Sequence, residues 1–374
     1  MTAVPPGPGP ALPDPGPVRP RFRHLPLLGL AATLAVVILT LGLSAWWITL
    51  AVERPYKGWA GDEVFVEIPQ GAGVASIARR LAEAGVIQRP LVFRLAAWQA
   101  GVDRTLKAGE YRFDRPMAPR RVVEKLAKGD VYVLEITFPE GLAIGEMAEI
   151  YERQGLGAAK DFAAAAREAA LIADLDPAAS DLEGYLFPDT YRVPRGLEAS
   201  ALVRQMVSRF REVFGPDERA RAAALGHTVR QIVTLASLVE KETARDEERP
   251  VVAAVYWNRL RLGIGLQCDP TVIYALARAG RWTGNLTRQD LQFDSRYNTY
   301  RYAGLPPGPI AAPGRASLAA ALAPADVPYL YFVSRNDGSH AFASTLSEHN
   351  ANVRRFQVEY FRQQRAARAA PGAR

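Results

Sequence analysis

The sequence predicts an α+β protein with one N-terminal transmembrane helix, a small module of strands and helices, and a larger mixed α/β domain. Three observations support this prediction: a long segment without charge, a strand-and-helix pattern that occurs twice, and helical patterns that alternate with loops rich in glycine and proline. The 374-residue chain is long enough for this arrangement. We divide it into residues 1–26, 27–52, 62–130, 131–357 and 358–374.

The N-terminal part predicts a disordered tail followed by a membrane anchor. Residues 1–26 carry nine prolines, and such a composition buries too little apolar surface to offset the entropy of ordering. Residues 27–52 carry no charge and, at about 1.5 Å per residue, form a helix long enough to cross a membrane. A cleaved signal peptide is the alternative, but the apolar run is too long for one. Arg19, Arg21 and Arg23 precede the helix and favour a cytoplasmic N-terminus.

Charge and composition argue against a nucleic-acid partner, an internal disulfide and a metal site. The net charge is +7, but outside the basic tail of residues 358–374 the basic residues lie among acidic ones, so nucleic acid is not expected as a partner. The single cysteine, Cys268, excludes an internal disulfide. His340 and His349 lack the paired spacing of metal ligands, so we expect no metal and no cofactor.

Residues 66–87 and 136–157 share one pattern. In both, an alternating apolar segment leads into Pro-x-Gly and then into apolar residues at helical spacing, which predicts strand, turn and helix. The aligned pairs are Pro69 with Pro139, Gly71 with Gly141, and Gly85 with Gly155. The first copy, within residues 62–130, resembles the LysM module, a small fold that binds N-acetylated glycans. The alternative is a favoured supersecondary unit without glycan contact.

The segment ASLVEKETARDEERP contains the candidate general acid. Its apolar spacing predicts an amphipathic helix from about Thr228, and Glu242 continues the stripe that contains Val239. At about 100° per residue, Glu240 points roughly 200° away from Glu242 and is expected to face solvent. A carboxyl on the apolar face has a raised pKa, as a general acid near neutral pH requires. The alternative is a Glu242 held by an arginine such as Arg259.

The other acidic and turn residues have structural interpretations. Residues 246–248 precede a second helical pattern, whose first turn favours negative charge. Asp269 followed by Pro270 is typical of a helix N-cap and first helical residue. A hairpin is predicted about residues 336–338, and a capping box at residues 345–348.

Aromatic, amide and carboxyl side chains in the segments DLEGYLFPDTYRVP and YNTYRYAGLPPGP suit a sugar-binding cleft, since sugar rings present apolar faces and hydroxyl edges. The same side chains could instead close a core or brace a loop. The candidate cleft residues are Glu183, Tyr185, Asn258, Gln267, Tyr297, Asn298 and Tyr300.

Taken in order, the motifs EGYLFPDTY, ASLVEKET, VYWNRLRLGIGLQCDPTVIY, YNTY, GLPPGPI and SHAFASTLSEHN resemble those of the YceG-like family, the MltG-type endolytic murein transglycosylases. The likeness covers about residues 62–357 and implies that Glu242, the second Glu of EKET, is the catalytic acid. It further implies cleavage of the MurNAc–GlcNAc bond within peptidoglycan strands to leave 1,6-anhydro ends, which would limit the length of nascent strands. Residues 131–357 are then the catalytic domain.

The resemblance also implies a location and partners. The chain would be a single-pass protein of the bacterial inner membrane with its catalytic part in the periplasm, acting beside a penicillin-binding protein or another wall synthase. Cys268 stands where serine or threonine is more usual and Ala312 where asparagine is common, and neither is expected to touch the acid. The alternative function is an inactive, anchored glycan-binding scaffold for wall synthases, against which the intact Glu242 motif argues.

Overall fold

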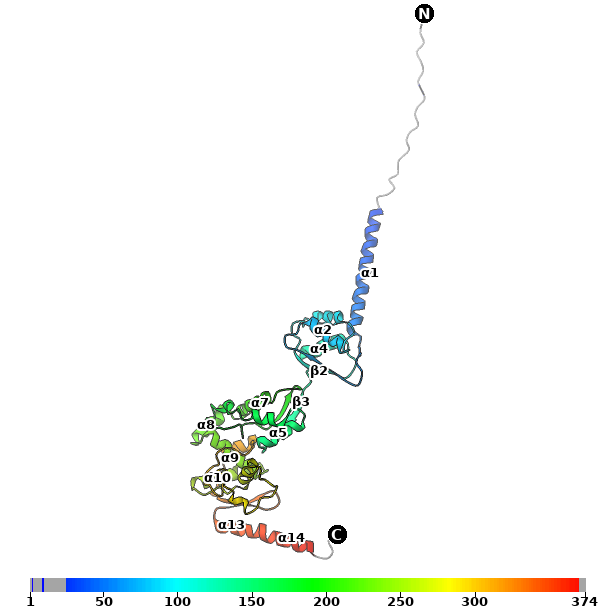
Figure 1. Cartoon of the computed structure of the whole chain (residues 1–374). Helices are drawn as coiled ribbons and strands as arrows, with labels where there is room; N and C mark the ends of the chain where they lie inside the picture. The colour runs from blue at the N-terminus through cyan, green and yellow to red at the C-terminus, as the bar shows by residue number, and fades with distance from the viewer. Residues whose placement is uncertain (1, 3–8, 10–24, 370–374) are drawn as a thin grey trace. The chain divides into compact units, whose positions relative to one another are not determined.

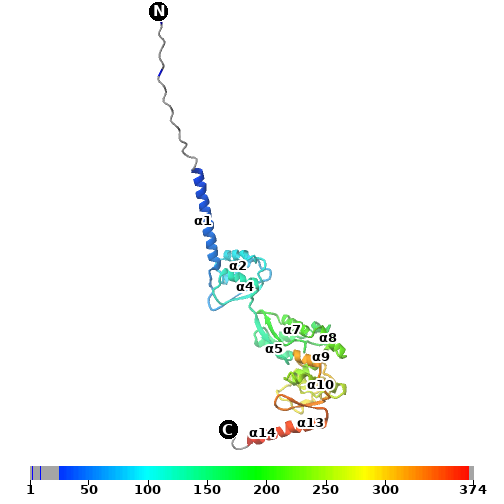
Figure 2. The same ribbon diagram turned by 180° about the vertical axis from the view of Figure 1, so that it is seen from behind.

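The computed structural model describes residues 2, 9 and 25–369, which belong to two compact units, Met1–Tyr132 and Val133–Arg374 (Figures 1 and 2). The predicted disordered tail lies outside the described residues except at residues 2, 9, 25 and 26. The three arginines used to predict the orientation of the helix also lie outside them.

Helix α1 (Leu25–Glu53) covers the predicted transmembrane segment. Its stretch Leu30–Glu53 is long and apolar enough to cross a membrane, with a mean hydropathy of 2.1. Large apolar side chains along it, including Leu34 and Trp46, are exposed in the isolated chain. Such exposure suits a helix surrounded by lipid.

The first unit continues with β1 (Val64–Ile68), α2 (Val74–Glu83), α3 (Pro90–Gln99), β2 (Gly109–Phe113) and α4 (Pro119–Lys128). Strands β1 and β2 are antiparallel and pair Val64 with Phe113 and Ile68 with Gly109. Alternate strand residues are buried and pack with apolar residues of α2, α3 and α4. The unit therefore has its own core.

The two copies of the sequence repeat adopt the predicted strand, turn and helix. In the second copy the elements are β3 (Leu134–Thr137) and α5 (Ile144–Arg153), which correspond to β1 and α2. The turn glycines Gly71 and Gly141 have φ values of +75° and +78°, and the glycines after the helices, Gly85 and Gly155, have +74° and +69°. These are left-handed conformations, which glycine adopts without strain.

The second unit contains most of the helices. After β3 and α5 come α6 (Ala159–Ala165), η1 (Ala169–Ile172), β4 (Thr190–Val193), α7 (Ala199–Val213), α8 (Pro216–Ala224), α9 (Val229–Glu242), α10 (Arg249–Arg261), α11 (Asp269–Arg278), η2 (Asp290–Gln292), α12 (Arg315–Leu322), β5 (Tyr331–Ser334), β6 (His340–Ala343), α13 (Leu346–Val353), η3 (Arg354–Glu359) and α14 (Tyr360–Ala369). Strand β3 pairs with β4 and β5 with β6, both antiparallel.

Helix α9 is the central helix of the second unit. Thr228 caps it, because its hydroxyl accepts a hydrogen bond from the Gln231 amide at 3.2 Å. Every residue from Ile232 to Val239 is buried, and α9 packs against α8, α10, α11 and α12. The helix ends at Glu242, where it leaves the core.

Two further predictions from the sequence are confirmed near the C-terminus. Strands β5 and β6 form a hairpin whose turn contains Asn336 and Gly338, with φ values of +67° and +82°. Helix α13 begins with the predicted capping box, in which Thr345 accepts from the Glu348 amide at 3.2 Å and Glu348 accepts from the Thr345 amide at 3.2 Å.

Candidate active site

Glu242 is the last residue of α9, and the residue as a whole is intermediate in exposure. Burial by the surrounding protein raises the pKa of Glu242 above its ordinary value, and the nearby Asp269 carboxylate raises it further. A positive charge on His340 acts in the opposite direction. The position at a helix C-terminus also disfavours a negative charge. Glu242 is thus a carboxyl that keeps its proton to higher pH than an exposed glutamate does.

Two buried side chains face the Glu242 carboxyl. Cys268 Sγ lies 3.6 Å from Glu242 Oε2, a distance at which the thiol donates a weak hydrogen bond. Burial raises the pKa of the Cys268 thiol well above its ordinary value, so the thiol keeps the proton that it donates. The buried Tyr256 hydroxyl lies next to both groups. The expectation that Cys268 does not touch the acid is therefore wrong.

Arg259 does not hold Glu242. Its guanidinium donates to Gln267 Oε1 at 2.8 Å and lies 5.6 Å from the centre of the Tyr331 ring. Across residues 25–369, no lysine or arginine forms an ion pair with Glu242. The ion-pair alternative is wrong, because the Glu242 carboxyl has no compensating cation in direct contact.

Glu240 is buried, contrary to the sequence prediction of a solvent-facing side chain. Its carboxylate accepts hydrogen bonds from Arg249 Nη2 at 3.2 Å and from the Gly314 amide at 2.9 Å. The side chains of Glu240 and Arg249 are each only 6% exposed. The helix face opposite Glu242 is covered by α12 and its preceding loop, so the two carboxylates occupy different buried environments.

The start of α11 supplies two polar side chains close to Glu242, Cys268 and Asp269. Cys268, and not Asp269, is the N-cap residue, and the Asp269 carboxylate accepts a hydrogen bond from the Tyr300 hydroxyl at 2.5 Å. The predicted capping role of Asp269 is therefore wrong. The adjacent residue, Gln267, is exposed and has a φ of +52°. A left-handed conformation costs a non-glycine residue about 1–3 kcal/mol and is often found at functional sites.

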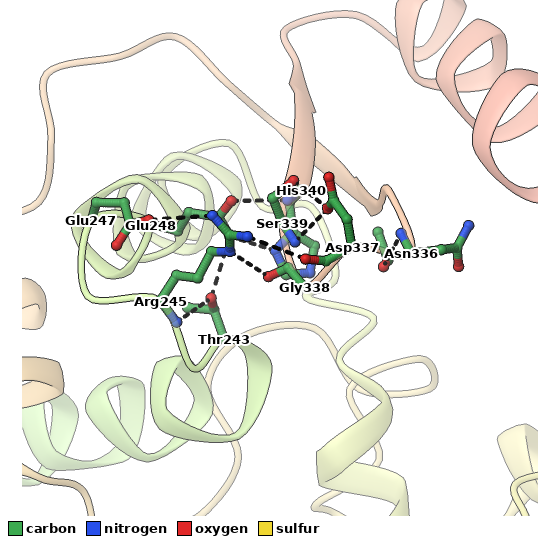
Figure 3. Close-up of polar contacts among 10 residues, drawn as sticks. Thr243, Arg245, Glu247, Glu248, Asn336, Asp337, Gly338, Ser339 and His340 are labelled. Atoms are coloured by element: carbon green, nitrogen blue, oxygen red, sulfur yellow. Dashed lines mark hydrogen bonds and ion pairs between the residues drawn. The ribbon is translucent and has the colours of Figure 1, made fainter.

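The loop between α9 and α10 is joined to the β5–β6 hairpin (Figure 3). Arg245 donates to the carbonyl oxygens of Gly338 and Asp337 at 3.0 and 3.1 Å. The Glu248 carboxylate accepts from the His340 amide at 2.9 Å and lies 2.7 Å from His340 Nδ1. The sequence interpretation treated Glu248 only as a charge at the start of a helix. Its partner lies 92 residues away, so no local pattern identifies the pair.

Among the seven candidate cleft residues, the structure brings Gln267 and Tyr300 close to the start of α11, on exposed positions. Asn298 is fully buried, and its amide donates to the carbonyl oxygens of Leu291 and Phe293, so it braces the loop that carries Tyr300.

Asn258 and Tyr185 lie elsewhere in the second unit. The Asn258 amide donates to the carbonyl oxygens of Val327 and Tyr329 at 2.8 and 3.1 Å, and the residue borders a cavity of about 570 Å³ beside α10. Tyr185 is buried, and its hydroxyl donates to Asp176 at 2.6 Å. Both side chains support the fold at these positions.

Glu183 and Tyr297 meet at the other end of α11. The buried Glu183 carboxyl accepts from the Tyr274 hydroxyl at 3.0 Å and from the Ile144 amide at 3.1 Å. Burial raises the pKa of Glu183 to about 8. The Tyr297 ring packs on Tyr274 at 5.0 Å and beneath the Arg278 guanidinium at 5.6 Å. Glu183 and Glu242, two carboxyls with raised pKa values, therefore lie near opposite ends of α11.

Comparison with known proteins identifies the family. Residues 66–355 match the sequence profile of the YceG-like family. The endolytic murein transglycosylase of Bacillus subtilis (strain 168) is 32% identical over 317 residues, which cover 79% of this chain and 86% of that protein. The endolytic murein transglycosylase of Streptococcus pneumoniae serotype 2 (strain D39) is 29% identical over 323 residues, which cover 78% of this chain and 58% of that protein.

A solved structure gives the same result. The crystal structure of a YceG-like protein from Listeria monocytogenes has a TM-score of 0.54 and 30% sequence identity, and the match covers 78% of this chain and 99% of that one. The matched segment contains every residue described around Glu242. Because the family profile spans well over half of its length, the chain belongs to the YceG-like family.

Proposed function

We propose that the chain is a membrane-anchored endolytic lytic transglycosylase that cleaves the MurNAc–GlcNAc bond within peptidoglycan strands and leaves 1,6-anhydroMurNAc ends. The observation that carries the proposal is the Glu242 carboxyl, which has a raised pKa and no ion-pair partner among the described residues, and which belongs to a residue that is not fully buried. These are the properties of a general acid near neutral pH. The names of the bacterial relatives supply the substrate class.

In the proposed mechanism, Glu242 acts first as an acid and then as a base. Its proton passes to the glycosidic oxygen as the bond between that oxygen and C1 of MurNAc breaks. The carboxylate then takes the proton of the C6 hydroxyl as the C6 oxygen bonds to C1, which closes the anhydro ring and restores the acid. No water is consumed, and one carboxyl suffices, unlike the pair of carboxylates common in glycoside hydrolysis. The Cys268 thiol, 3.6 Å away, is placed to donate to the carboxylate while it carries charge.

We assign substrate contact to Tyr300, which is exposed and close to Glu242, to the exposed Gln267 at the start of α11, and to Tyr297 on the same loop as Tyr300. The exposed Tyr300 ring offers an apolar face to a sugar, while its hydroxyl remains bound to Asp269. The other four candidates, Glu183, Tyr185, Asn258 and Asn298, form hydrogen bonds within the protein, and of these Asn298 braces the loop that carries Tyr300.

The anchor and the first unit have proposed roles as well. Helix α1 would fix the enzyme in the bacterial inner membrane with the second unit in the periplasm, close to nascent strands and to a penicillin-binding protein or another wall synthase. The order strand, helix, helix, strand in residues 64–113 supports a LysM-like module that contacts glycan. Together these roles would let the enzyme set the length of new strands.

The test uses the full chain in detergent and purified, uncrosslinked glycan strands. We expect shorter strands with 1,6-anhydroMurNAc ends, formed by cleavage at internal positions. Reducing MurNAc ends would indicate a hydrolase and overturn the proposal. Bound but uncut strands would indicate a glycan-binding scaffold. Glu242→Gln in the same assay distinguishes activity of the chain from that of a contaminant.

A further inference from the structure

Glu248, which precedes α10, and His340 of β6 form a buried pair that several hydrogen bonds hold in place (Figure 3). The Glu248 carboxylate accepts the His340 amide at 2.9 Å with one oxygen, while its other oxygen lies 2.7 Å from His340 Nδ1 and accepts from Thr243 Oγ1 at 3.3 Å. The side chains of Glu248 and His340 are only 11% and 13% exposed. Two aromatic rings flank the imidazole, Phe332 at 5.4 Å and Phe342 at 6.3 Å. The ring is therefore held in one orientation.

Glu248 also determines which nitrogen of His340 carries a proton. Burial raises the pKa of Glu248, but the hydrogen bonds from His340 outweigh it and hold the pKa below its ordinary value, so the carboxylate is ionised. An ionised carboxylate only accepts hydrogen bonds, and therefore Nδ1 must carry a hydrogen. Across residues 25–369, Nε2 has no hydrogen-bond partner in the protein.

The pair is linked directly to the residue that follows Glu242. Thr243 is the C-cap of α9, and its hydroxyl donates to Glu248 while accepting the Arg245 amide at 3.1 Å. The groups that act on the Glu242 carboxyl include Tyr256 of α10, Cys268 and Asp269 at the start of α11, and His340 of β6. Of these, only His340 can carry a positive charge.

We propose that Glu248 and His340 are positioning residues for the chemistry of Glu242: the imidazole, oriented by Glu248, stabilises the carboxylate that Glu242 becomes after it has donated its proton. The proposal rests on the proposed function, because it concerns the second half of that reaction. Burial favours the acid that starts the reaction and opposes the base that completes it. A nearby imidazolium balances the two requirements, since its attraction grows as Glu242 gains charge. An analogous division of labour, in which a buried carboxylate fixes a histidine, operates in hydrolytic triads.

The test compares His340→Asn with Arg245→Met in the full chain. Asparagine keeps a donor for Glu248 near the position of Nδ1 but carries no charge. The methionine variant removes the bonds from Arg245 to the hairpin turn and its ion pair with Glu247 at 3.4 Å, and leaves the Glu248–His340 pair in place. We expect His340→Asn to lower kcat about tenfold with little change in KM, and to move the alkaline limb of the kcat/KM profile to higher pH by up to about one unit. Arg245→Met should lower the Tm and leave that limb in place.

A second measurement needs no substrate. Cys268 is the only cysteine of the chain and contacts Glu242, so its infrared S–H stretching band, which lies apart from other protein bands, reports the charge of that carboxyl. We expect the band to shift as Glu242 titrates, with a midpoint at higher pH in His340→Asn than in the wild type. Glu242→Gln tests whether the shift of the band comes from Glu242. In this variant the band should no longer shift with pH.

The outcomes separate the two proposals. Equal midpoints in the wild type and His340→Asn, or the same shift in Arg245→Met, would overturn the positioning role. The Glu248–His340 pair would then only stabilise the hairpin. A wild-type chain that forms no anhydro ends would overturn the proposed function, while the infrared titration would still decide whether His340 acts on Glu242.

Discussion

The repeated strand-and-helix unit occurs once in each half of the molecule, and the surroundings of the two copies differ. At the turn of the first copy, a side chain at Gly71 would meet nothing within 4 Å. At the turn of the second copy, the Gly141 amide donates to Ala312 at 2.8 Å, and the Gly141 carbonyl accepts from Lys241 at 3.0 Å. A side chain at Gly141 would meet Glu240 and Lys241 at 3.7 Å. The second turn therefore supports the end of α9.

The helices that follow the two turns differ in the same way. Helix α2 begins after Gly73 without a side-chain cap. Helix α5 begins at Ile144, whose amide donates to Glu183, and Glu183 also accepts from Tyr274 of α11. The second copy is thus joined both to the helix that carries Glu242 and to the helix whose start faces it. One local pattern serves as part of a separate module in the first unit and as a support for the candidate site in the second.

The largest effect expected from the difference between the two units is on the catalytic rate. It is tested by the same substitution at the last residue of a helix in each unit. Glu242 ends α9 and Glu83 ends α2, so the same substitution can be made in both units. Glu242→Gln removes the transferable proton and should lower the rate of anhydro product formation by about 10²-fold to 10⁴-fold. Its Tm should be equal or higher, since a buried carboxyl for function usually costs stability. Rates are measured by chromatography of digested strands.

Glu83→Gln is the matched control, because Glu83 is exposed. It should change neither rate nor Tm. Near-normal turnover in Glu242→Gln would contradict the assignment of the general acid, and an equal loss in Glu83→Gln would remove the distinction between the two units.

The next effect is on stability and concerns Glu240. When the Glu240 charge is removed, the buried Arg249 guanidinium loses its ion pair with a buried carboxylate. The hydrogen bond from the Gly314 amide is weakened as well. We expect Glu240→Gln to lower the free energy of unfolding by about 3 kcal/mol and the Tm by roughly 10 °C. Activity per folded molecule should change far less than in Glu242→Gln. A calorimetric Tm equal to that of the wild type would show that the pair contributes little.

The contrast between Glu240 and Glu242 shows how far the sequence could lead. Helical periodicity placed the two carboxyls on different faces, and the structure agrees. Periodicity also implied that one face is buried and the other solvated, but all residues from Ile232 to Val239 are buried because α9 lies inside a bundle of helices. The environment of Glu240 depends on Arg249 and Gly314, and no helical pattern predicts such contacts.

The same limit applies to the rest of the site. Local signals predicted the transmembrane-length helix, the two copies of the repeat, the start of α9 near Thr228, the Thr345 capping box and the β5–β6 hairpin, because each depends on neighbouring residues. The contact between Cys268 and Glu242 joins positions 26 residues apart, and the bond between Glu248 and His340 joins positions 92 apart. These contacts follow from how α9, α10, α11 and β6 pack together, which the motifs indicate only through the family resemblance.

A smaller effect concerns how stability depends on pH in the second copy. The folded-state pKa of Glu183 is raised by burial from 4.5 to about 8. Between these values the folded state binds more protons than the unfolded state, so stability should fall as pH rises from about 5 to 8. Glu242 also has a raised pKa and contributes with the same sign, so the comparison is made in the Glu242→Gln background.

In that background, Glu183→Gln should flatten the fall of Tm between about pH 5 and pH 8, because a neutral amide can still accept from Ile144 and Tyr274 without titrating. Melting curves at several pH values in matched ionic strength provide the measurement. An unchanged slope would mean that Glu183 ionises in the folded protein as it does in an exposed site.

The smallest effect is the most direct test of the difference between the two copies. Gly71 and Gly141 have nearly the same φ, +75° and +78°, so alanine at either position should destabilise its own unit by about 1 kcal/mol through backbone strain. The consequences for activity should differ. At Gly71 the strain relaxes into open space, whereas at Gly141 it acts on the bonds to Ala312 and Lys241 that hold the end of α9. We therefore expect Gly141→Ala to lower kcat severalfold at a temperature where both variants are fully folded, and Gly71→Ala to leave kcat unchanged. Since the local strain is matched, an equal loss of kcat in the two variants would mean that the turn of the second copy has no special relation to Glu242, and that its contacts with α9 only stabilise the fold.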